Sequence, residues 1–383
     1  MSIFQRLRRN KTDRAVRASA RTGLIGLDIG THSLRLCQLR EAEHNCYTIL
    51  AKNTVGFEGS RQQLLESPAE FKRLVARALK GKPFKGRKVT AIMPPDEVRI
   101  IMLTYKASVP DIDAEILNLL ESRLDGDIDD YVVDYLPVRN NKGDDEHIVL
   151  ASVAPRDKVW RLLNLLQHAG LHAQSLDIGP SALKRLIGAL YLDKRESNVL
   201  VINVGDDESY LTIISGRRLL FDQPVHFGCI EVLQEISQTL EISQDHAKSM
   251  LQQHGVARHS AQAGAHDTLV DPNEVAATLL EIVKPKLQKL VEEINRVLVY
   301  AASETHGEPL SRVCLLGSIA RWPGVEELIL SFLDVQAPSS QQEFYEVFLD
   351  ASDNTEPWYN LFPDMAIAVG LALRGLYQNR GDG

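Results

Sequence analysis

The chain has 383 residues, of which 44% are hydrophobic and 25% are charged, and its formal net charge is −8. This length exceeds one ordinary hydrophobic core, so we expect two or more domains, and the negative charge argues against a general nucleic-acid-binding protein. The four cysteines have no CxxC spacing and are expected to be reduced thiols. No apolar run approaches the roughly 20 residues that span a bilayer, and no signal-peptide core follows Met1. These features are typical of a cytoplasmic globular protein.

Residues 1–22 differ from the rest of the chain in charge. They contain seven lysines and arginines against one acidic residue, Asp13, and Ile3, Phe4 and Leu7 can share one helical face. A short basic amphipathic segment can rest on an anionic membrane surface, and a solvated tail is the alternative interpretation.

A predicted β-hairpin follows at residues 24–39, where apolar residues flank a short polar turn. The turn contains Asp28 at the end of the first strand, then Gly30, Thr31 and Ser33, and Arg35 begins the second strand. Glycine lets backbone amides approach a ligand closely, and the hydroxyls add donors, so such a turn can bind phosphate oxygens. Because Asp-x-Gly turns are common, a plain hairpin is the alternative.

From residue 47 to residue 192, strand and helix periods alternate. They predict strands at 47–51, 89–93, 98–103, 131–135, 147–153 and 171–176, and helices at 71–79, 112–124, 159–168 and 181–192. Asp111 is the expected N-cap of the second of these helices, and Pro180 suits the start of the last. The order β-β-α-β-β-α-β between residues 88 and 176 indicates a compact α+β subdomain inserted in the first lobe.

A second copy of the hairpin begins at Asn198. The apolar run 199–204 contains Asn203 and leads to Gly205, which match Asp28 and Gly30, and the strand-like run 210–214 follows. Strand-like runs at 217–221, 224–228 and 311–316 and helices at 229–240, 243–253, 271–303, 325–333 and 363–374 complete the prediction, with a kink or break at Pro285. The three histidines in the polar loop 254–266 lack helical spacing and adjacent acids, so we interpret them as exposed.

Taken in order, these segments resemble the PilM family, the actin-like cytoplasmic assembly proteins of type IV pili, and more distantly FtsA of cell division. The resemblance rests on residues 26–35, 91–94, 169–177, 315–324 and 368–374 and covers about residues 23–378. It implies an α/β fold of the two-lobed actin-like (ribonuclease H-like) ATPase type with an inserted α+β subdomain. It also implies ATP and Mg²⁺ in the cleft between the lobes, and docking on the cytoplasmic tail of a PilN-like inner-membrane partner.

The resemblance assigns site residues by position. The first phosphate site comprises Asp28, Gly30, Thr31, Ser33 and Arg35, with Asp28 also the implied metal ligand. The second phosphate site comprises Asn203 and Gly205, and the adenosine face comprises Gly317, Ser318 and Gly324. Asp28 and Asp177 are the candidate catalytic residues, and Asp177 is the positional candidate for a general base.

Three positions depart from the family pattern. Asn203 stands where an aspartate is usual, residues 206–208 are all acidic in place of a small hydroxyl-rich turn, and Gly317-Ser318 replaces a double glycine. Three carboxylates repel a triphosphate unless a cation intervenes, so we expect at most a weak ATPase and a mainly structural role. An active ATPase or sugar kinase, and an FtsA-like filament protein, are the alternatives. FtsA-like proteins are expected to end in an amphipathic membrane helix, whereas residues 379–383 are short and polar.

The expected organisation has six parts. They are the basic segment 1–22, the first lobe 23–87, the inserted subdomain 88–176, a connecting helix 177–197, the second lobe 198–345 and a segment returning to the first lobe, 346–383. The resemblance implies a cytoplasmic location peripheral to the inner membrane, possible contact with an anionic membrane through residues 1–22, and possible homo-oligomers. We also expect the inserted subdomain to help form a groove for a partner's peptide.

Overall fold

The structure is a computed structural model that describes most of the chain. The described residues are 21–42, 46–106, 108–139, 145–191, 198–216, 218–256, 272–304, 310–333, 344, 347–350 and 362–377. Most of the basic segment 1–22 and most of the histidine-containing loop lie outside these ranges, so the interpretations of both stay predictions.

The first lobe is built on a six-stranded sheet with the order β13-β3-β2-β1-β4-β8. Its strands are β1 (Thr22–Ile29), β2 (Ser33–Glu41), β3 (Tyr47–Gly56), β4 (Lys88–Ile92), β8 (His172–Asp177) and β13 (Phe348–Asp350). Strand β1 is almost wholly buried because both faces of the sheet are covered. On one face Leu27 shares a core with Phe71 and Leu74 of α2 (Pro68–Leu79).

The second lobe repeats this arrangement in a four-stranded sheet with the order β11-β10-β9-β12. Its strands are β9 (Asn198–Val204), β10 (Ser209–Ser215), β11 (Arg218–Val225) and β12 (Leu310–Gly317). In both sheets the central strand pairs antiparallel with the next strand of its hairpin and parallel with a later strand: β1 with β2 and β4, and β9 with β10 and β12. The predicted repeat of the hairpin is therefore confirmed at the level of topology.

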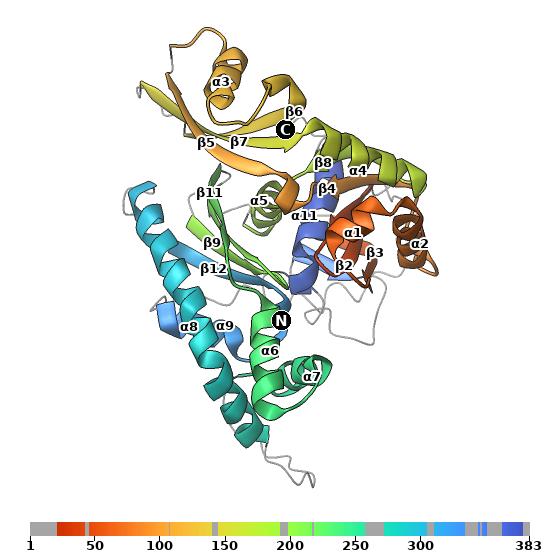
Figure 1. Ribbon diagram of the computed structural model, residues 1–383, viewed down its shortest axis with the longest axis vertical. Helices are drawn as coiled ribbons and strands as arrows, with labels where there is room; N and C mark the ends of the chain where they lie inside the picture. Colours follow the sequence, from red (N-terminus) through yellow and green to blue (C-terminus); the bar gives the residue numbers. More distant parts are fainter. Residues whose placement is uncertain are drawn as a thin grey trace, which may run out of the picture.

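A separate three-stranded sheet with the order β5-β7-β6 forms the inserted subdomain. Its strands are β5 (Arg99–Lys106), β6 (Tyr131–Arg139) and β7 (Glu146–Pro155), and α3 (Ile112–Glu121) covers one face, as Figure 1 shows at the top of the molecule. The predicted N-cap of α3 is confirmed, since the backbone N–H of Ala114 donates to Asp111 over 3.0 Å. The opposite face carries Val138 and Leu150, which belong to the large core that the second lobe shares with α5 and α11.

The structure differs from the sequence expectation at the two ends of this insertion. From the sequence, the strands at 89–93 and 171–176 are expected within the inserted subdomain. Instead β4 pairs parallel with β1, and β8 pairs parallel with β4, so both strands extend the six-stranded sheet. Parallel neighbours need a long crossover connection, and the whole segment between β4 and β8 is that crossover.

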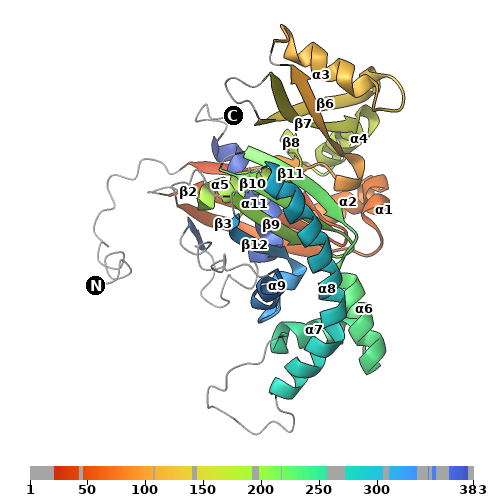
Figure 2. The same cartoon turned by 90° about the vertical axis from the view of Figure 1, so that its left-hand side faces the viewer.

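The remaining helices mostly follow the predicted pattern. They are α4 (Arg156–His168), α5 (Gly179–Leu190), α6 (Cys229–Leu240), α7 (Gln244–His254), α8 (Pro272–Glu304), α9 (Val325–Leu333) and α11 (Phe362–Tyr377). Helix α8 continues through Pro285, so of the two expected outcomes there the break does not occur, and a short helix not expected from the sequence, α1 (Arg61–Glu66), precedes α2. Figure 2 shows α6, α7 and α8 at the end of the molecule opposite α3.

Two helices, α5 and α11, lie between the sheets of the two lobes (Figure 1). Their small residues let backbones approach closely: a Cβ atom on Gly26 of β1 would overlap the carbonyl oxygen of Ala368 in α11. A Cβ atom on Gly370 of α11 would in the same way overlap the carbonyl oxygen of Ala182 in α5. The alanines and glycines of α11 thus allow its backbone to contact both β1 and α5 closely.

Candidate functional site

A cavity of about 460 Å³ lies where the turns of both hairpins face β5 and α5. This volume is in the range of sites for small molecules. Eight residues singled out from the sequence line it: Asp28, Gly30, Thr31, Arg35, Asn203, Gly205, Gly317 and Ser318. The other three, Ser33, Asp177 and Gly324, are not among its lining residues. The fold therefore brings most of the predicted positions to one cleft.

The first hairpin turn presents a paired carboxylate and guanidinium to the cavity. The backbone N–H of Gly30 donates to the carbonyl of Ser33 over 2.9 Å and closes the turn. Arg35, two residues into β2, reaches back so that its Nη1 lies 3.4 Å from Oδ2 of Asp28. A Cβ atom on Gly30 would overlap this Nη1, so the glycine leaves the space that the Arg35 side chain occupies.

Asp28 is in an unusual electrostatic environment for a carboxylate. Burial raises its pKa, since the residue is only 7% exposed, and the nearby charges of Arg35 and Arg61 oppose that rise. Asp206, from the facing hairpin, raises the pKa of Asp28 further. The carboxylates of Asp28 and Asp206 thus repel each other across the cavity. The two arginines that offset this repulsion both come from the first lobe.

The second hairpin turn is tied to the protein around it. The backbone N–H of Gly205 donates to the carbonyl of Glu208 over 3.2 Å, and the first N–H groups of α6 donate to the carbonyls of Gly205 and Asp206. The hydroxyl of Ser318 lies 3.3 Å from Oδ1 of Asp206. Gly317 has φ 86°, and a Cβ atom there would overlap the carbonyl of Val204, so the end of β12 is pressed against this turn.

Carboxyl groups dominate the second-lobe wall of the cavity. Tyr210 donates its hydroxyl to Glu208 over 2.7 Å, and Thr212 donates to Asp222 over 2.6 Å. Burial raises the pKa of Asp222 to about 7 and also raises that of Asp364, which forms an ion pair with Arg321. Such carboxyl groups are protonated more readily than exposed ones.

The two turns also contact each other. Nε2 of His32, from the first turn, lies 3.6 Å from Oδ2 of Asp207 in the second. Both side chains are nearly half exposed, so this contact spans the mouth of the cleft between the lobes. When His32 is protonated, the contact becomes a screened surface ion pair.

Asp177 has its carboxylate directed to two arginines instead of to the cavity. Its Oδ2 accepts from Arg185 of α5 and lies 2.9 Å from Nη1 of Arg374 in α11. Its Oδ1 accepts the backbone N–H of Ile178 at the start of α5. With a side chain only 3% exposed, Asp177 joins the end of β8 to both helices that lie between the lobes.

The structure adds cavity residues that the sequence did not single out, notably Arg61, Asp222 and Asp364. Arg61 is the first residue of α1, which starts with a capping box: Gln63 N–H donates to the Ser60 hydroxyl, and the Gln63 side chain accepts from Ser60 N–H. The Ser-x-x-Gln pattern at residues 60–63 is the sequence signal that predicts such a start.

The described residues contain neither a preformed metal site nor a membrane-spanning helix. Within the described ranges, no group of three or more histidine, cysteine, aspartate and glutamate side chains is arranged to hold a metal ion. The same part of the chain contains no helix long and apolar enough to cross a membrane.

Comparisons with known proteins identify one family model and two solved structures with a similar fold. The model of the family described as type IV pilus assembly protein PilM matches residues 26–376. A chain of the solved PilM-PilN type IV pilus biogenesis complex is 18% identical, with a TM-score of 0.71 over 92% of this chain and 98% of that chain. The ethanolamine utilization protein EutJ from Carboxydothermus hydrogenoformans is 12% identical, with a TM-score of 0.51 over 92% of this chain and 89% of that chain. These likenesses confirm the predicted two-lobed actin-like fold with its inserted subdomain.

Proposed function

The chain belongs to the PilM family of type IV pilus assembly proteins, and from this membership we propose that it is an adaptor that docks on a PilN-like partner. The observation that carries the proposal is the match of the family model over residues 26–376. The likeness to a chain of the PilM-PilN complex over 98% of that chain supports it. The proposed location is the cytoplasmic side of the inner membrane, where the tail of such a partner is accessible.

We further propose that the cleft binds ATP through the first hairpin. The guanidinium of Arg35 and the turn from Gly30 to Thr31 line the cavity together, and arginine with a glycine turn is a recurrent combination for phosphate. The guanidinium of Arg35 is held at this wall by Asp28, whose Oδ2 lies 3.4 Å from its Nη1.

Bound Mg²⁺ would supply positive charge between the phosphates and the acidic second hairpin. Asp28 is the proposed metal ligand, and Asn203, at the equivalent position of the second hairpin, contributes an amide oxygen and no charge. Because the described residues contain no preformed metal cluster, we propose that any cation is held mainly together with the phosphates.

We propose nucleotide binding with little hydrolysis. A general base must be free to accept a proton within reach of the nucleophile, whereas the carboxylate of Asp177 is held by Arg185 and Arg374. Asp28 is paired with Arg35. Neither candidate catalytic residue has the free carboxylate that efficient phosphoryl transfer to water or a sugar requires, which favours the adaptor over an active ATPase or sugar kinase.

We propose that the inserted subdomain helps form the groove that binds the partner's peptide. We also retain the division of the chain into six parts as a proposal. Residues 98–101, at the start of β5, line the cavity, so the subdomain and the cleft share a wall. Titration with the cytoplasmic-tail peptide of a PilN-like protein, followed by hydrogen exchange, tests this assignment. Protection within residues 98–155 is expected, and binding that protects other regions alone would contradict it.

Calorimetric titration with Mg-ATP tests nucleotide binding. We expect micromolar binding by the full chain and a loss of at least about tenfold in Asp28→Ala, because the carboxylate positions both Arg35 and the cation. Ser33→Ala is the matched control, since Ser33 belongs to the same turn but does not line the cavity. If the wild-type chain gives no heat, nucleotide binding is excluded, and the adaptor role is then tested by the peptide titration.

A further inference from the structure

The segment between β4 and β5 connects the first lobe to the inserted subdomain. It contains a single 3₁₀ turn, Pro95–Glu97, flanked by Pro94 and Val98. Just after it, Arg99 at the start of β5 pairs with Val153 near the end of β7, so the chain enters and leaves the inserted sheet side by side. The inserted subdomain therefore connects to the six-stranded sheet through a narrow junction.

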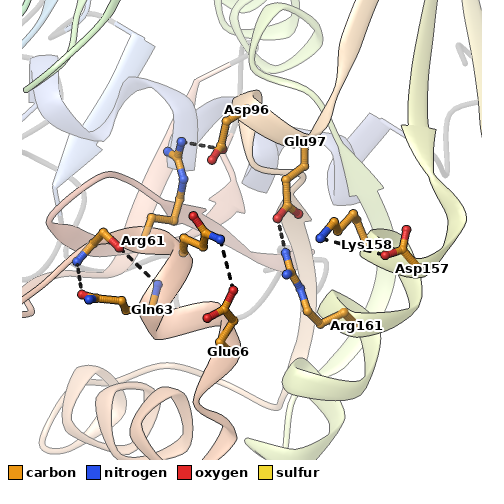
Figure 3. A network of polar contacts seen from close by, with 10 residues as sticks. Arg61, Gln63, Glu66, Asp96, Glu97, Asp157, Lys158 and Arg161 are labelled. Carbon is orange, nitrogen blue, oxygen red and sulfur yellow. Dashed lines mark hydrogen bonds and ion pairs between the residues drawn. The ribbon is translucent and has the colours of Figure 1, made fainter. Parts of the chain in front are cut away.

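Two ion pairs fix this junction from either side (Figure 3). Nη2 of Arg61, from α1, lies 2.6 Å from Oδ1 of Asp96. Arg161, from α4, pairs with the next residue, Glu97. The second pair is the more enclosed, with side chains 23% and 12% exposed, whereas the Asp96 side chain is 54% exposed. An exposed pair is screened and holds less firmly, so the Arg61–Asp96 contact is the one that a ligand can displace.

Arg61 also faces the cavity. It lines the same space as Asp28 and Arg35, and its charge acts on both lobes, since it lowers the pKa of Asp28 and opposes the rise in the pKa of Tyr210. Its Nε is buried without a hydrogen-bond partner in the described part of the chain. One nitrogen of the guanidinium, Nη2, is thus engaged by Asp96, while the side chain also lines the cavity.

The position of Arg61 is well defined. The capping box of Ser60 and Gln63 fixes the first turn of α1, and Leu64 and Leu65 anchor the helix in the core of the first lobe. A guanidinium on a fixed helix start can exchange between two anions by side-chain rotation, without moving its backbone.

We propose that Arg61 binds the terminal phosphate of a nucleoside triphosphate, and that Asp96 competes for the same guanidinium. Occupation of the cleft then weakens the contact between α1 and the junction, while the Glu97–Arg161 pair remains as a pivot. The connection between β4 and β5 therefore becomes more mobile when a triphosphate is bound, and less mobile when the terminal phosphate is absent. This inference rests on the proposed nucleotide function and adds its means of control.

Titration calorimetry of the full chain with Mg-ATP and with Mg-ADP tests the competition. Arg61→Gln should weaken Mg-ATP binding by about tenfold and leave Mg-ADP binding within about twofold, because a lost charge-assisted bond to one phosphate affects one nucleotide. Asp96→Asn should tighten Mg-ATP binding by about threefold, since it releases the guanidinium. The double variant should behave like Arg61→Gln. Arg73→Gln, at an exposed position on α2, is the matched control.

Hydrogen exchange gives a second measurement that does not depend on affinity. Adding Mg-ATP to the wild-type chain should speed amide exchange in residues 96–106, to the rate that we expect for Asp96→Asn without nucleotide. Mg-ADP should leave exchange in this segment unchanged. Unchanged exchange with saturating Mg-ATP would overturn the proposed coupling to the inserted subdomain.

The outcomes separate this inference from the proposed function. If the wild-type chain binds Mg-ATP and Arg61→Gln, with an unchanged melting temperature, binds it equally well, Arg61 does not bind the phosphate and nucleotide binding stands. Equal weakening of Mg-ATP and Mg-ADP would also overturn the inference, because Arg61 would then contact a phosphate common to both. If the wild-type chain binds neither nucleotide, both proposals fail together.

Discussion

The two hairpins share a backbone arrangement and differ in chemistry. The first strand of each hairpin, β1 or β9, pairs antiparallel with the second strand of the hairpin and parallel with a later strand. Each hairpin also has a glycine in its turn. In the first, Arg35 lies over the glycine and pairs with Asp28. In the second, the equivalent position holds the neutral amide of Asn203, and the carboxyl groups that line the cavity are those of Asp206 and Glu208.

This difference shows how a repeated topology can produce an asymmetric cleft. The first hairpin supplies cationic and backbone donors, which attract phosphate, while the second supplies carboxylates, which repel it. The turn of the second hairpin also binds the start of α6 and the Ser318 hydroxyl, so its polar groups hold the second lobe together. We interpret the first hairpin as the ligand-binding half of the cleft and the second as mainly structural.

The largest effect is expected at Asp177, the second buried carboxylate of the first lobe. Asp28 has one arginine at 3.4 Å, whereas Asp177 pairs with two, from α5 and α11. Asp177→Ala leaves two partly buried guanidinium groups without their carboxylate and should destabilise the chain by about 3–5 kcal/mol. Urea unfolding measures the loss. A loss below about 1 kcal/mol would show that Asp177 does not hold the helices, and would reopen its role as a base.

Alanine substitutions at the equivalent glycines, Gly30 and Gly205, distinguish a structural role of each turn from a role in ligand binding. A Cβ atom on Gly205 would overlap the backbone carbonyl of Glu208, which cannot move without opening the turn, so Gly205→Ala should cost about 1–3 kcal/mol of stability. A Cβ atom on Gly30 would overlap the flexible end of Arg35, so Gly30→Ala should cost less than about 1 kcal/mol. Thermal unfolding compares the two variants. Equal losses of stability would contradict the different roles assigned to the turns.

Gly30→Ala should instead weaken Mg-ATP binding, because it displaces the guanidinium that we assign to phosphate. Titration calorimetry on both glycine variants checks this point. Stronger weakening in Gly205→Ala than in Gly30→Ala would reverse the assignment of the binding half.

The pH dependence of unfolding should show how much the buried carboxyl group of Asp222 destabilises the second lobe when it is charged. Burial raises its pKa from 3.8 to about 7, so the folded chain keeps this proton while the unfolded chain loses it as the pH rises from about 4 to 7. The wild-type chain should therefore lose stability relative to Asp222→Asn over this range. The variant should be similar near pH 4 and more stable by up to about 4 kcal/mol near pH 8, as measured by urea unfolding. A constant difference across the range would show that Asp222 is not protonated in the folded chain.

Much of the fold could be predicted from the sequence because the signals are local. The apolar runs ending in Asp28 and Gly30, and in Asn203 and Gly205, predict the two hairpins, and the small residues of α11 predict its close packing. The edges of the insertion could not be predicted in this way. Strands β4 and β8 read like any other short apolar strands, and their place in the six-stranded sheet depends on long-range parallel pairing.

The cavity residues that lie on the two hairpins could be predicted from the sequence, whereas those on other elements could not. Eight of the positions singled out by resemblance lie along one cavity, although their roles stay predictions. Arg61 reaches that cavity from a helix whose capping signal is short, and Asp222 reaches it from the third strand of the second sheet. Asp177 is the opposite case, because it was predicted for the site but does not line the cavity. The position of a carboxylate in the sequence does not show which arginines the fold will bring to it.

The most direct test of the asymmetric cleft is one series of Mg-ATP titrations on the wild-type chain, Arg35→Gln and Asp206→Asn. We expect opposite changes: a loss of at least about tenfold in affinity for Arg35→Gln, and a gain of about threefold for Asp206→Asn, because one removes attraction and the other removes repulsion. Melting curves of both variants ensure that folded chains are compared. Weakening in both variants, or no change in Arg35→Gln, would contradict the claim that the first hairpin is the binding half.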